Sequence, residues 1–402
     1  MPNFSASRTK RIFSYNSGDT HLIYFDNSAT TQPLPEVVAY ITENLSDPEG
    51  FGNTGSLHRL GTLAGKQRDQ ALERISKALD CSPKELVFTS GGTESINTAI
   101  RGYLSANPRA GNRIISTRTE HKASLKVLES LEKSGYQVEY LPVDLLGQPD
   151  LEALDSMLRT RTALLTLTHV NNETGAILPI KDIVQLRNRI SPETRIHLDC
   201  VQSLGKLPMN LHRMGVDMAS FSGHKIHCVK GIGGLFLRSG CRIDPLLLGG
   251  GQQNGLRSGT ECPWLYQALA IAVEESGRRC EKAYSNAVLL RNTLLKGLGH
   301  RPLTVNSPPD GSPFIVNLSF SGFQAQTMLQ ALEAHGVFVS TVSACASRKQ
   351  EISYVLQEMG VARDVAARAL RVSFSSFSLV EEVVSFCEIV ENIYREFSLE
   401  RG

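Results

Sequence analysis

The chain has 402 residues, 41% of them hydrophobic, which is enough for one large core or for two domains. Its 42 basic and 40 acidic residues give a net charge of +2, so it lacks the excess positive charge that is typical of nucleic-acid-binding proteins. No apolar stretch approaches the roughly 20 residues of a membrane-spanning helix, and the first residues lack the apolar segment of a signal peptide. We therefore expect a cytoplasmic protein of two domains that binds neither nucleic acid nor membrane.

Short apolar segments alternate with helical patterns from about residue 35 onward. This alternation is typical of βαβ units, which form a mostly parallel sheet with helices on both faces. The expected strands are 85–90, 113–118, 138–143, 163–170, 195–201 and 233–238, and the expected helices between them include 58–79, 123–135 and 177–190. Sheets of this kind bind ligands at the carboxyl ends of their strands.

The pattern changes after Trp264. A long helical segment at 263–298 precedes two further strands, at 314–320 and 337–343, and more helices. We expect these elements to form a second, smaller α/β domain.

A glycine-rich segment, TSGGTES at 89–95, joins an expected strand to an expected helix. Glycines at such a junction let backbone N–H groups approach an anion, and the helix N-terminus adds the positive end of its dipole. The segment is compatible with a phosphate site, although in isolation a glycine turn before a Thr/Ser-rich helix start is the favoured interpretation.

Two charged residues follow later strands. Asp199 ends the strand at 195–201, and a carboxylate buried there needs a cation or several donors. Lys225 follows the small residues of SFSGHK (220–225), and a lysine desolvated at a strand end can form a Schiff base. A surface lysine is the plain alternative. Together with the glycine segment, these two residues predict a site for pyridoxal 5′-phosphate (PLP).

Eight cysteines occur without a CxxC pair and without the His/Cys spacing of a zinc site, so we expect no metal centre. Most of them are expected to be reduced, buried thiols. Cys345, in the polar segment SACASRKQEIS (343–353), is the exception, because flanking Arg and Lys residues favour a reactive thiolate.

Eight motifs in chain order resemble those of the cysteine desulfurases, which are class-V aminotransferases with the fold-type I PLP architecture. The resemblance extends from about residue 22 to 396. The motifs are YFDNSATT (24–31), TSGGTES (89–95), TEHKA (119–123), HVNNETG (169–175), HLDCVQSLGKLP (197–208), SFSGHK (220–225), GLRSGT (255–260) and SACAS (343–347).

The resemblance implies a role for each matching residue. Lys225 would be the Schiff-base lysine, Asp199 would pair with the pyridinium nitrogen, and His121 would lie over the ring. Asn172 and Gln202 would lie near the ring, with Gln202 at the phenolic oxygen. The phosphate would be bound by Gly92, Thr93, Ser222 and His224, and by Thr260 of the partner subunit in a homodimer.

The implied activity is the removal of sulfur from L-cysteine. Cys345 would take up the sulfur as a persulfide and release alanine, and Arg371 would bind the substrate carboxylate as a planar fork. The sulfur would then pass to an acceptor or iron–sulfur scaffold protein. The implied domains are a large PLP-binding domain at 33–264, a small domain formed by 21–32 with 265–402, and an N-terminal extension at 1–20.

The chain departs from the family pattern at several positions: Cys200, Ile226 to Val229, Leu248, Val342 and Ser375. Val342 stiffens a backbone position that is often glycine, just before Cys345. Two alternatives therefore stay open beside the desulfurase. One is a selenocysteine lyase or another PLP-dependent class-V relative, and the other is a weakly active scaffold for sulfur-transfer proteins.

Overall fold

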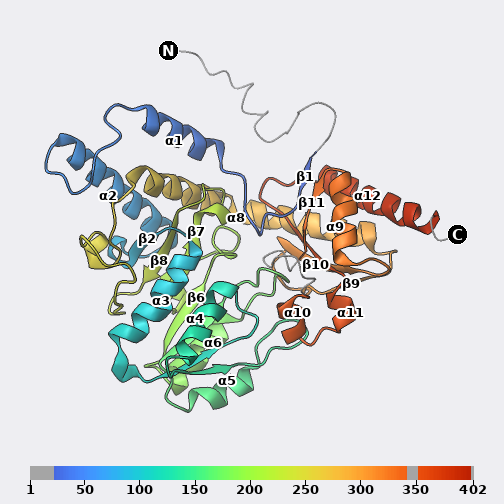
Figure 1. Ribbon diagram of the computed structural model, residues 1–402, viewed down its shortest axis with the longest axis horizontal. Helices are drawn as coiled ribbons and strands as arrows, with labels where there is room; N and C mark the ends of the chain where they lie inside the picture. The colour runs from blue at the N-terminus through green and yellow to red at the C-terminus, as the bar shows by residue number, and fades with distance from the viewer. Residues whose placement is uncertain (1–21, 342–351, 400–402) are drawn as a thin grey trace. The chain divides into compact units, whose positions relative to one another are not determined.

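The computed structural model describes residues 22–341 and 352–399 (Figure 1). The chain divides into two compact units. The large unit comprises Thr31–Asn171 and Ile177–Cys280, and the small unit comprises Met1–Thr30, Asn172–Ala176 and Glu281–Gly402. Among the described residues, the domain ranges expected from the sequence differ from these units in placing 31–32 and 265–280 in the small domain and 172–176 in the large one.

The large unit is built on a seven-stranded sheet with the strand order β2-β8-β7-β6-β5-β3-β4. Strands β7, β6, β5, β3 and β4 pair in parallel, whereas β8 is antiparallel to both of its neighbours. The strands are β2 (Leu86–Thr89), β3 (Arg113–Ser116), β4 (Gln137–Tyr140), β5 (Leu164–Thr168), β6 (Arg195–Asp199), β7 (Met218–Ser222) and β8 (Gly233–Leu237). The expected α/β class with a mainly parallel sheet is confirmed.

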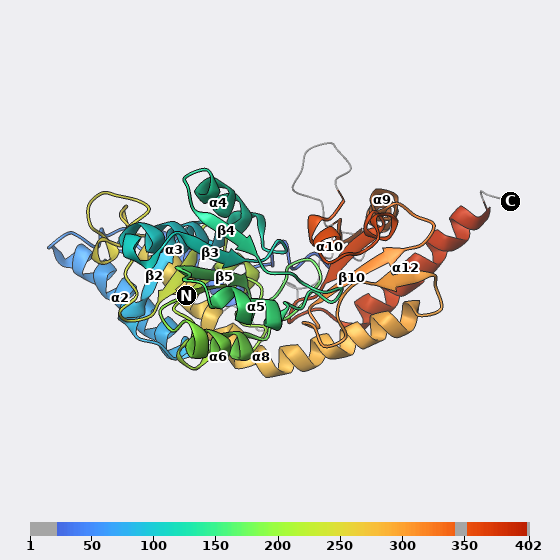
Figure 2. The same cartoon turned by 90° about the horizontal axis from the view of Figure 1, so that it is seen from below.

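Helices cover both faces of this sheet. Helices α3 and α4 pack on one face through a core that includes Ile100, Leu128 and Leu164, and α6 and the first part of α8 lie on the other face (Figure 2). The helices of the unit are α1 (Pro35–Ser46), α2 (Arg59–Leu79), α3 (Gly92–Ala106), α4 (Lys122–Glu132), α5 (Leu151–Leu158), α6 (Ile180–Ile190), α7 (Leu211–Met214) and the start of α8 (Pro263–Leu298). With both faces covered, only the strand ends remain for a ligand.

The small unit contains a four-stranded antiparallel sheet, β12-β13-β10-β9, and a parallel pair, β1-β11. Its core joins strands β10 and β13 to the last part of α8, α9 and α12. The strands are β1 (Ile23–Tyr24), β9 (Leu303–Val305), β10 (Ile315–Phe320), β11 (Val337–Phe338), β12 (Ser340–Thr341) and β13 (Ala369–Ser373), and the helices are α9 (Ala325–Ala334), α10 (Tyr354–Glu358), α11 (Arg363–Ala366) and α12 (Val380–Leu399).

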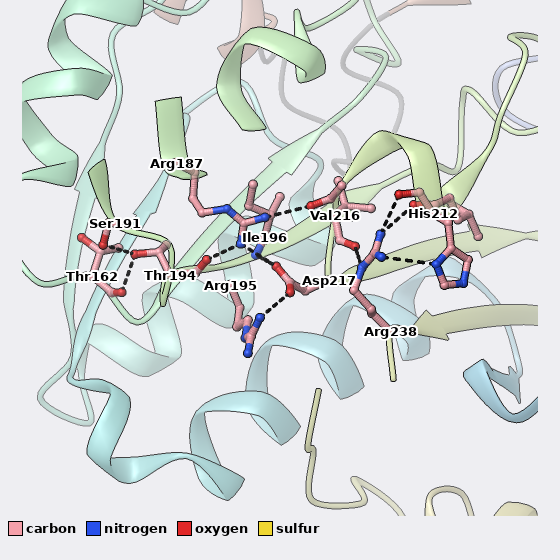
Figure 3. A network of polar contacts seen from close by, with 12 residues as sticks. Thr162, Arg187, Ser191, Thr194, Arg195, Ile196, His212, Val216, Asp217 and Arg238 are labelled. Carbon is pink, nitrogen blue, oxygen red and sulfur yellow. Dashed lines mark hydrogen bonds and ion pairs between the residues drawn. The ribbon is translucent and has the colours of Figure 1, made fainter. Parts of the chain in front are cut away.

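A buried polar network fixes the amino ends of β6 and β7 in the large unit (Figure 3). The Asp217 carboxylate, 2% exposed, accepts hydrogen bonds from Arg187 at 2.9 Å and from Arg195 at 2.8 Å. It also accepts the backbone N–H of Ile196 at 2.9 Å. Since Arg187 belongs to α6, this network ties the helix to the sheet at the edge opposite to the carboxyl ends of the strands.

Candidate active site

The carboxyl ends of four strands meet at one edge of the large sheet. Thr168 ends β5 and lies opposite Asp199, which ends β6, and Asp199 in turn lies opposite Ser220 of β7. Strand β2 runs in the same direction as β7, because each is antiparallel to β8. The glycine segment after β2 and the candidate residues after β6 and β7 therefore share this edge, as expected for a ligand site in an α/β sheet.

The glycine segment forms the N-terminus of α3. Gly91 has a φ of +152°, a conformation that favours glycine. A Cβ atom added to Gly92 would lie 2.7 Å from Cγ2 of Val201, so this position has room for glycine only. No side chain of the described residues caps the helix, and Ser222 lies beside Gly91 while Thr93 is exposed in the first turn. The first-turn N–H groups are thus available to an anion.

Asp199 is the acid at the centre of this edge. Its side chain is buried, and Oδ1 accepts the backbone N–H of Val201 at 2.9 Å. Burial raises the pKa of the carboxyl group to about 6, although the Val201 hydrogen bond and the Lys225 ammonium oppose that rise. A buried carboxylate of this kind is stabilised by a protonated partner.

Lys225 lies in a short 3-10 turn, Gly223–Lys225, directly after β7. The turn is held from two sides. The Gly223 N–H donates to the carbonyl of Ile232, and the His224 carbonyl accepts both the N–H and the hydroxyl of Thr31. The positive charge of Lys225 opposes the rise in the pKa of Asp199 and contributes to the lowered pKa of His121. The Lys225 amine therefore lies close enough to both residues to affect their ionisation.

Two histidines near Lys225 are neutral at physiological pH. His121 caps α4, with Nδ1 accepting the backbone N–H of Ala123 at 3.1 Å, so the proton of the neutral ring is on Nε2. The surrounding protein and the Lys225 ammonium lower the pKa of His121 to about 4. Burial and the nearby lysines likewise lower the pKa of His224 to about 4.

Gln202 and Thr260 lie in different settings within the large unit. Gln202 is buried in the turns after β6, where its Oε1 accepts a hydrogen bond from Lys206. Thr260 is exposed. The segment before Thr260 is tied to α3, because Arg257 donates to Glu94 at 2.9 Å.

The candidate substrate-binding residues belong to the small unit. Arg371 on β13 is buried, donating from Nη1 to the carbonyl of Asn172 and from Nη2 to the carboxylate of Asp26, each at 2.8 Å. Among the described residues, Nε of Arg371 and Oδ1 of Asn172 are buried without a hydrogen-bond partner. Both atoms are thus available to a polar ligand. Cys345 and Val342 lie outside the described residues.

Some of the described departures from the family pattern are buried and others lie at the surface or in a turn. Cys200 and Cys228 are fully buried, and burial raises the pKa of both thiols, that of Cys228 to about 12. These thiols stay protonated and fill the core, as expected from the sequence. Leu248, in contrast, is 85% exposed, and Ser375 donates its N–H to Ser378.

Sequence reasoning missed a second buried acid, Glu120, which directly precedes His121. Its carboxylate accepts the N–H and the hydroxyl of Thr168, at 2.9 and 2.6 Å, and the hydroxyl of Thr117 at 3.0 Å. Burial, and the nearby charge of Asp199, raise the pKa of Glu120 to about 7 despite these hydrogen bonds. The only signal was its place in the motif TEHKA. Asp26, the partner of Arg371, was likewise present in a quoted motif without an assigned role.

The fold and the site are those of an α/β enzyme with a ligand site at the strand ends of its sheet. Comparisons with known proteins show the family to which this enzyme belongs. Residues 23–386 match the model of the aminotransferase class-V family. A solved structure described as a NifS-like protein has a TM-score of 0.87 and 35% identity, covering 93% of this chain and 99% of its own. DndA from Streptomyces lividans has a TM-score of 0.73 and 34% identity, covering 86% and 97%.

Two relatives within this family are cysteine desulfurases. The cysteine desulfurase IscS of Clostridium botulinum is 37% identical over 387 residues, which is 93% of this chain and 94% of the relative. The cysteine desulfurase of Trichormus azollae is 38% identical over 376 residues, 92% of each chain. The chain belongs to the cysteine desulfurases of the aminotransferase class-V family, and the expected resemblance is confirmed.

Enzymes of this family are PLP-dependent in general, and the residues of this chain fit that cofactor. The uncapped N-terminus of α3 suits the phosphate, and the buried Asp199 carboxylate suits a protonated ring nitrogen. Lys225 supplies an amine at the same edge. Within the described part of the chain, no helix has the length and apolar character needed to cross a membrane.

Proposed function

We propose that this protein is a PLP-dependent cysteine desulfurase that converts L-cysteine to L-alanine and retains the sulfur as a persulfide on Cys345. The observation that supports this most directly is the buried Asp199 carboxylate, whose pKa is raised to about 6 at the strand edge that also bears Lys225. A carboxylate in this setting is suited to hold a protonated pyridine nitrogen. The bound cofactor would then draw electrons from the Cα–H bond of the substrate.

The cofactor would be held mainly by residues of the large unit. In our proposal Lys225 binds it covalently, Asp199 bonds to its ring nitrogen and His121 lies over its ring. Gln202 and Asn172 would lie near the ring, with Gln202 at its phenolic oxygen. The phosphate would be bound by Gly92, Thr93, Ser222 and His224, and by the Thr260 of a second subunit, a role to which the exposure of Thr260 is suited.

Each catalytic step is assigned to a residue of the chain. The Lys225 amine would accept the α-proton of the substrate as general base. The neutral His121 ring, protonated on Nε2, orients the reacting groups without adding a charge. Arg371 binds the substrate carboxylate, for which its unpaired Nε is available.

Cys345 would perform the sulfur transfer. Its thiolate attacks the substrate sulfur, so that an S–S bond forms while the substrate Cβ–S bond breaks and its electron pair is protonated to give the methyl group of alanine. We further propose that the enzyme is a cytoplasmic homodimer. Its persulfide would pass to an acceptor thiol of a protein that assembles iron–sulfur clusters or thiolated cofactors.

The test is the visible absorption of the purified protein, recorded before and after addition of L-cysteine, with alanine and sulfide measured under reductant. We expect a visible absorption band in the wild type, no such band in Lys225→Ala, and a band without desulfuration in Cys345→Ser. Equal amounts of alanine and sulfide with cysteine, and less product with selenocysteine or cysteine sulfinate, would separate this function from that of a lyase relative. A wild-type protein without the band would reject the proposal.

A further inference from the structure

Lys206 is a buried lysine in the large unit, four residues after Gln202. It is only 7% exposed, and its Nζ donates to Oε1 of Gln202 at 2.8 Å. The local backbone explains this contact. Leu204 N–H donates to the Cys200 carbonyl and Leu207 N–H to that of Ser203, a helix-like pattern that brings residues four apart to the same side.

The identity of the donor fixes the orientation of the Gln202 amide. An ammonium group has three donors and no acceptor, so the Gln202 atom in contact with it must be the oxygen. The NH₂ group of Gln202 is then directed away from Lys206. Without a lysine at this position, the amide of Gln202 could present either its oxygen or its nitrogen to a ligand.

The charge of Lys206 acts on the candidate site itself. It contributes to the lowered pKa of His224, the residue before Lys225, and to that of His227. A buried ammonium is costly unless its partners compensate it. The position of this cation beside Gln202 and near His224 thus indicates a role at the site.

We propose that Lys206 is a positioning residue for the cofactor. By holding Oε1 of Gln202, it presents the Gln202 NH₂ group as a donor to the ring hydroxyl oxygen of bound PLP. A donor there favours the more negatively charged form of the bound cofactor, so Lys206 lowers the midpoint pH of the cofactor's absorption change. This inference rests on the proposed function, which supplies the cofactor.

The experiment compares Lys206→Met, Lys206→Arg and Lys230→Met. Two quantities are measured in each holoenzyme: the midpoint pH of the visible absorption change, and the dissociation constant of PLP after removal and readdition. For Lys206→Met we expect a rise of about one pH unit and roughly tenfold weaker PLP binding, as for the loss of a charge-assisted hydrogen bond. Lys206→Arg, which keeps the donors, should stay within about threefold of the wild type in PLP binding.

Lys230→Met is the matched control. Lys230 is exposed and also acts on His224, so its removal takes one positive charge from the same region without touching Gln202. A midpoint that moves as far in Lys230→Met as in Lys206→Met would overturn the proposal. In that case the charge alone would explain the effect.

A double-mutant cycle with Gln202→Ala decides whether Lys206 acts through Gln202. In the Gln202→Ala background, Lys206→Met should change the dissociation constant of PLP by no more than about twofold. It should move the midpoint pH by no more than about 0.3 unit. An undiminished effect there would contradict positioning. If Lys206→Met does not fold, Lys206→Ala, whose side chain has no donor and cannot reach Gln202, should still raise the midpoint, and an unchanged midpoint would overturn the inference.

Failure of this inference differs from failure of the proposed function. A wild-type protein without the visible band contradicts PLP binding itself. A wild-type protein that has the band, together with variants that leave its midpoint unchanged, contradicts only the role of Lys206.

Discussion

Glu120 and Asp199 are two buried acids on neighbouring parts of the same strand edge, and each raises the question of where its proton lies. Asp199 is affected by the charge of the Lys225 ammonium, whereas Glu120 accepts hydrogen bonds from Thr117 and Thr168. Burial is the main cause of the raised pKa of both groups. The folded protein therefore binds protons on these carboxyls at a pH at which the unfolded chain has released them.

The difference in pKa between the folded and the unfolded state predicts how the free energy of unfolding depends on pH. The pKa of Glu120 is raised from 4.5 to about 7, so its stabilising effect is complete below pH 4.5 and is lost as the pH rises through 7. Between those values the loss is on the order of 3 kcal/mol. In Glu120→Gln the fall in unfolding free energy of the apoprotein from pH 5 to pH 8 should be smaller, as measured by denaturant titration.

The exposed Glu129 on α4 provides the control for that titration. Glu129→Gln should follow the wild-type pH dependence, while a smaller fall remains in Glu120→Gln because Asp199 also releases its proton in this range. Parallel curves for wild type and Glu120→Gln would mean that Glu120 is ionised in the fold at pH 5.

At the scale of the elements, the sequence was most informative for the large unit. The expected strands at 85–90, 163–170 and 195–201 enclose β2, β5 and β6, and the expected helix at 263–298 matches α8. The glycine segment, Asp199 and Lys225 were expected at strand ends and lie there. Period and β-branched composition are local properties, so these elements could be predicted from local sequence.

Strand β7, which Lys225 follows, was expected only as a strand end without a range, because its residues lack those local signals. Strand β7 has the sequence MASFS, with two serines and no β-branched residue, and it is a strand because β6 and β8 pair with it on both sides. The sequence also gave no sign that 172–176 belongs with the small unit. That placement depends on bonds between distant residues, such as the one from Asn317 to the Glu173 carbonyl at 3.2 Å.

The Asp217 network makes a prediction for α6 and the sheet. In Arg187→Met the buried Asp217 loses one partner, and the carbonyls of Thr194 and Gly215 lose a donor. We expect a loss of about 3–5 kcal/mol in unfolding free energy, as for a broken buried ion pair. Cofactor binding by the folded protein should change little, because the network lies at the opposite edge of the sheet.

Arg195 contacts the same carboxylate and is the comparison for that measurement. Its side chain is 38% exposed, so Arg195→Met should cost no more than about 1 kcal/mol. Denaturant titration of both variants measures the difference. A loss in Arg187→Met no larger than that in Arg195→Met would show that burial does not control the strength of this network.

At the scale of the whole molecule, the small unit combines three separate parts of the chain. Strand β1 pairs with β11, and the chain just after it bridges Ser373 at the end of β13. Phe25, which is fully buried, makes edge-to-face contacts with Phe374 and Phe386, at centroid distances of 5.2 and 5.9 Å. The start of the described chain is therefore part of the core of the small unit.

Removing the Phe25 ring should consequently destabilise the small unit. Phe25→Ala is expected to lower the unfolding free energy by about 3–5 kcal/mol, because it leaves a cavity in a closely packed core. Phe51→Ala is the same substitution at a residue that is 77% exposed, and it should cost less than about 0.5 kcal/mol. Far-UV circular dichroism during denaturation measures both, and equal losses would contradict a structural role for the first segment.

The pairing of Ile23 with Val337 also affects folding during synthesis, because the two paired strands are far apart in the sequence. Ribosomes synthesise roughly 5–20 residues per second, so β1 leaves the exit tunnel on the order of 20–60 s before β11. During that interval its apolar side chains have no partner strand. The nascent polypeptide must therefore keep its leading segment from aggregating until translation is nearly complete, a task suited to a holding chaperone.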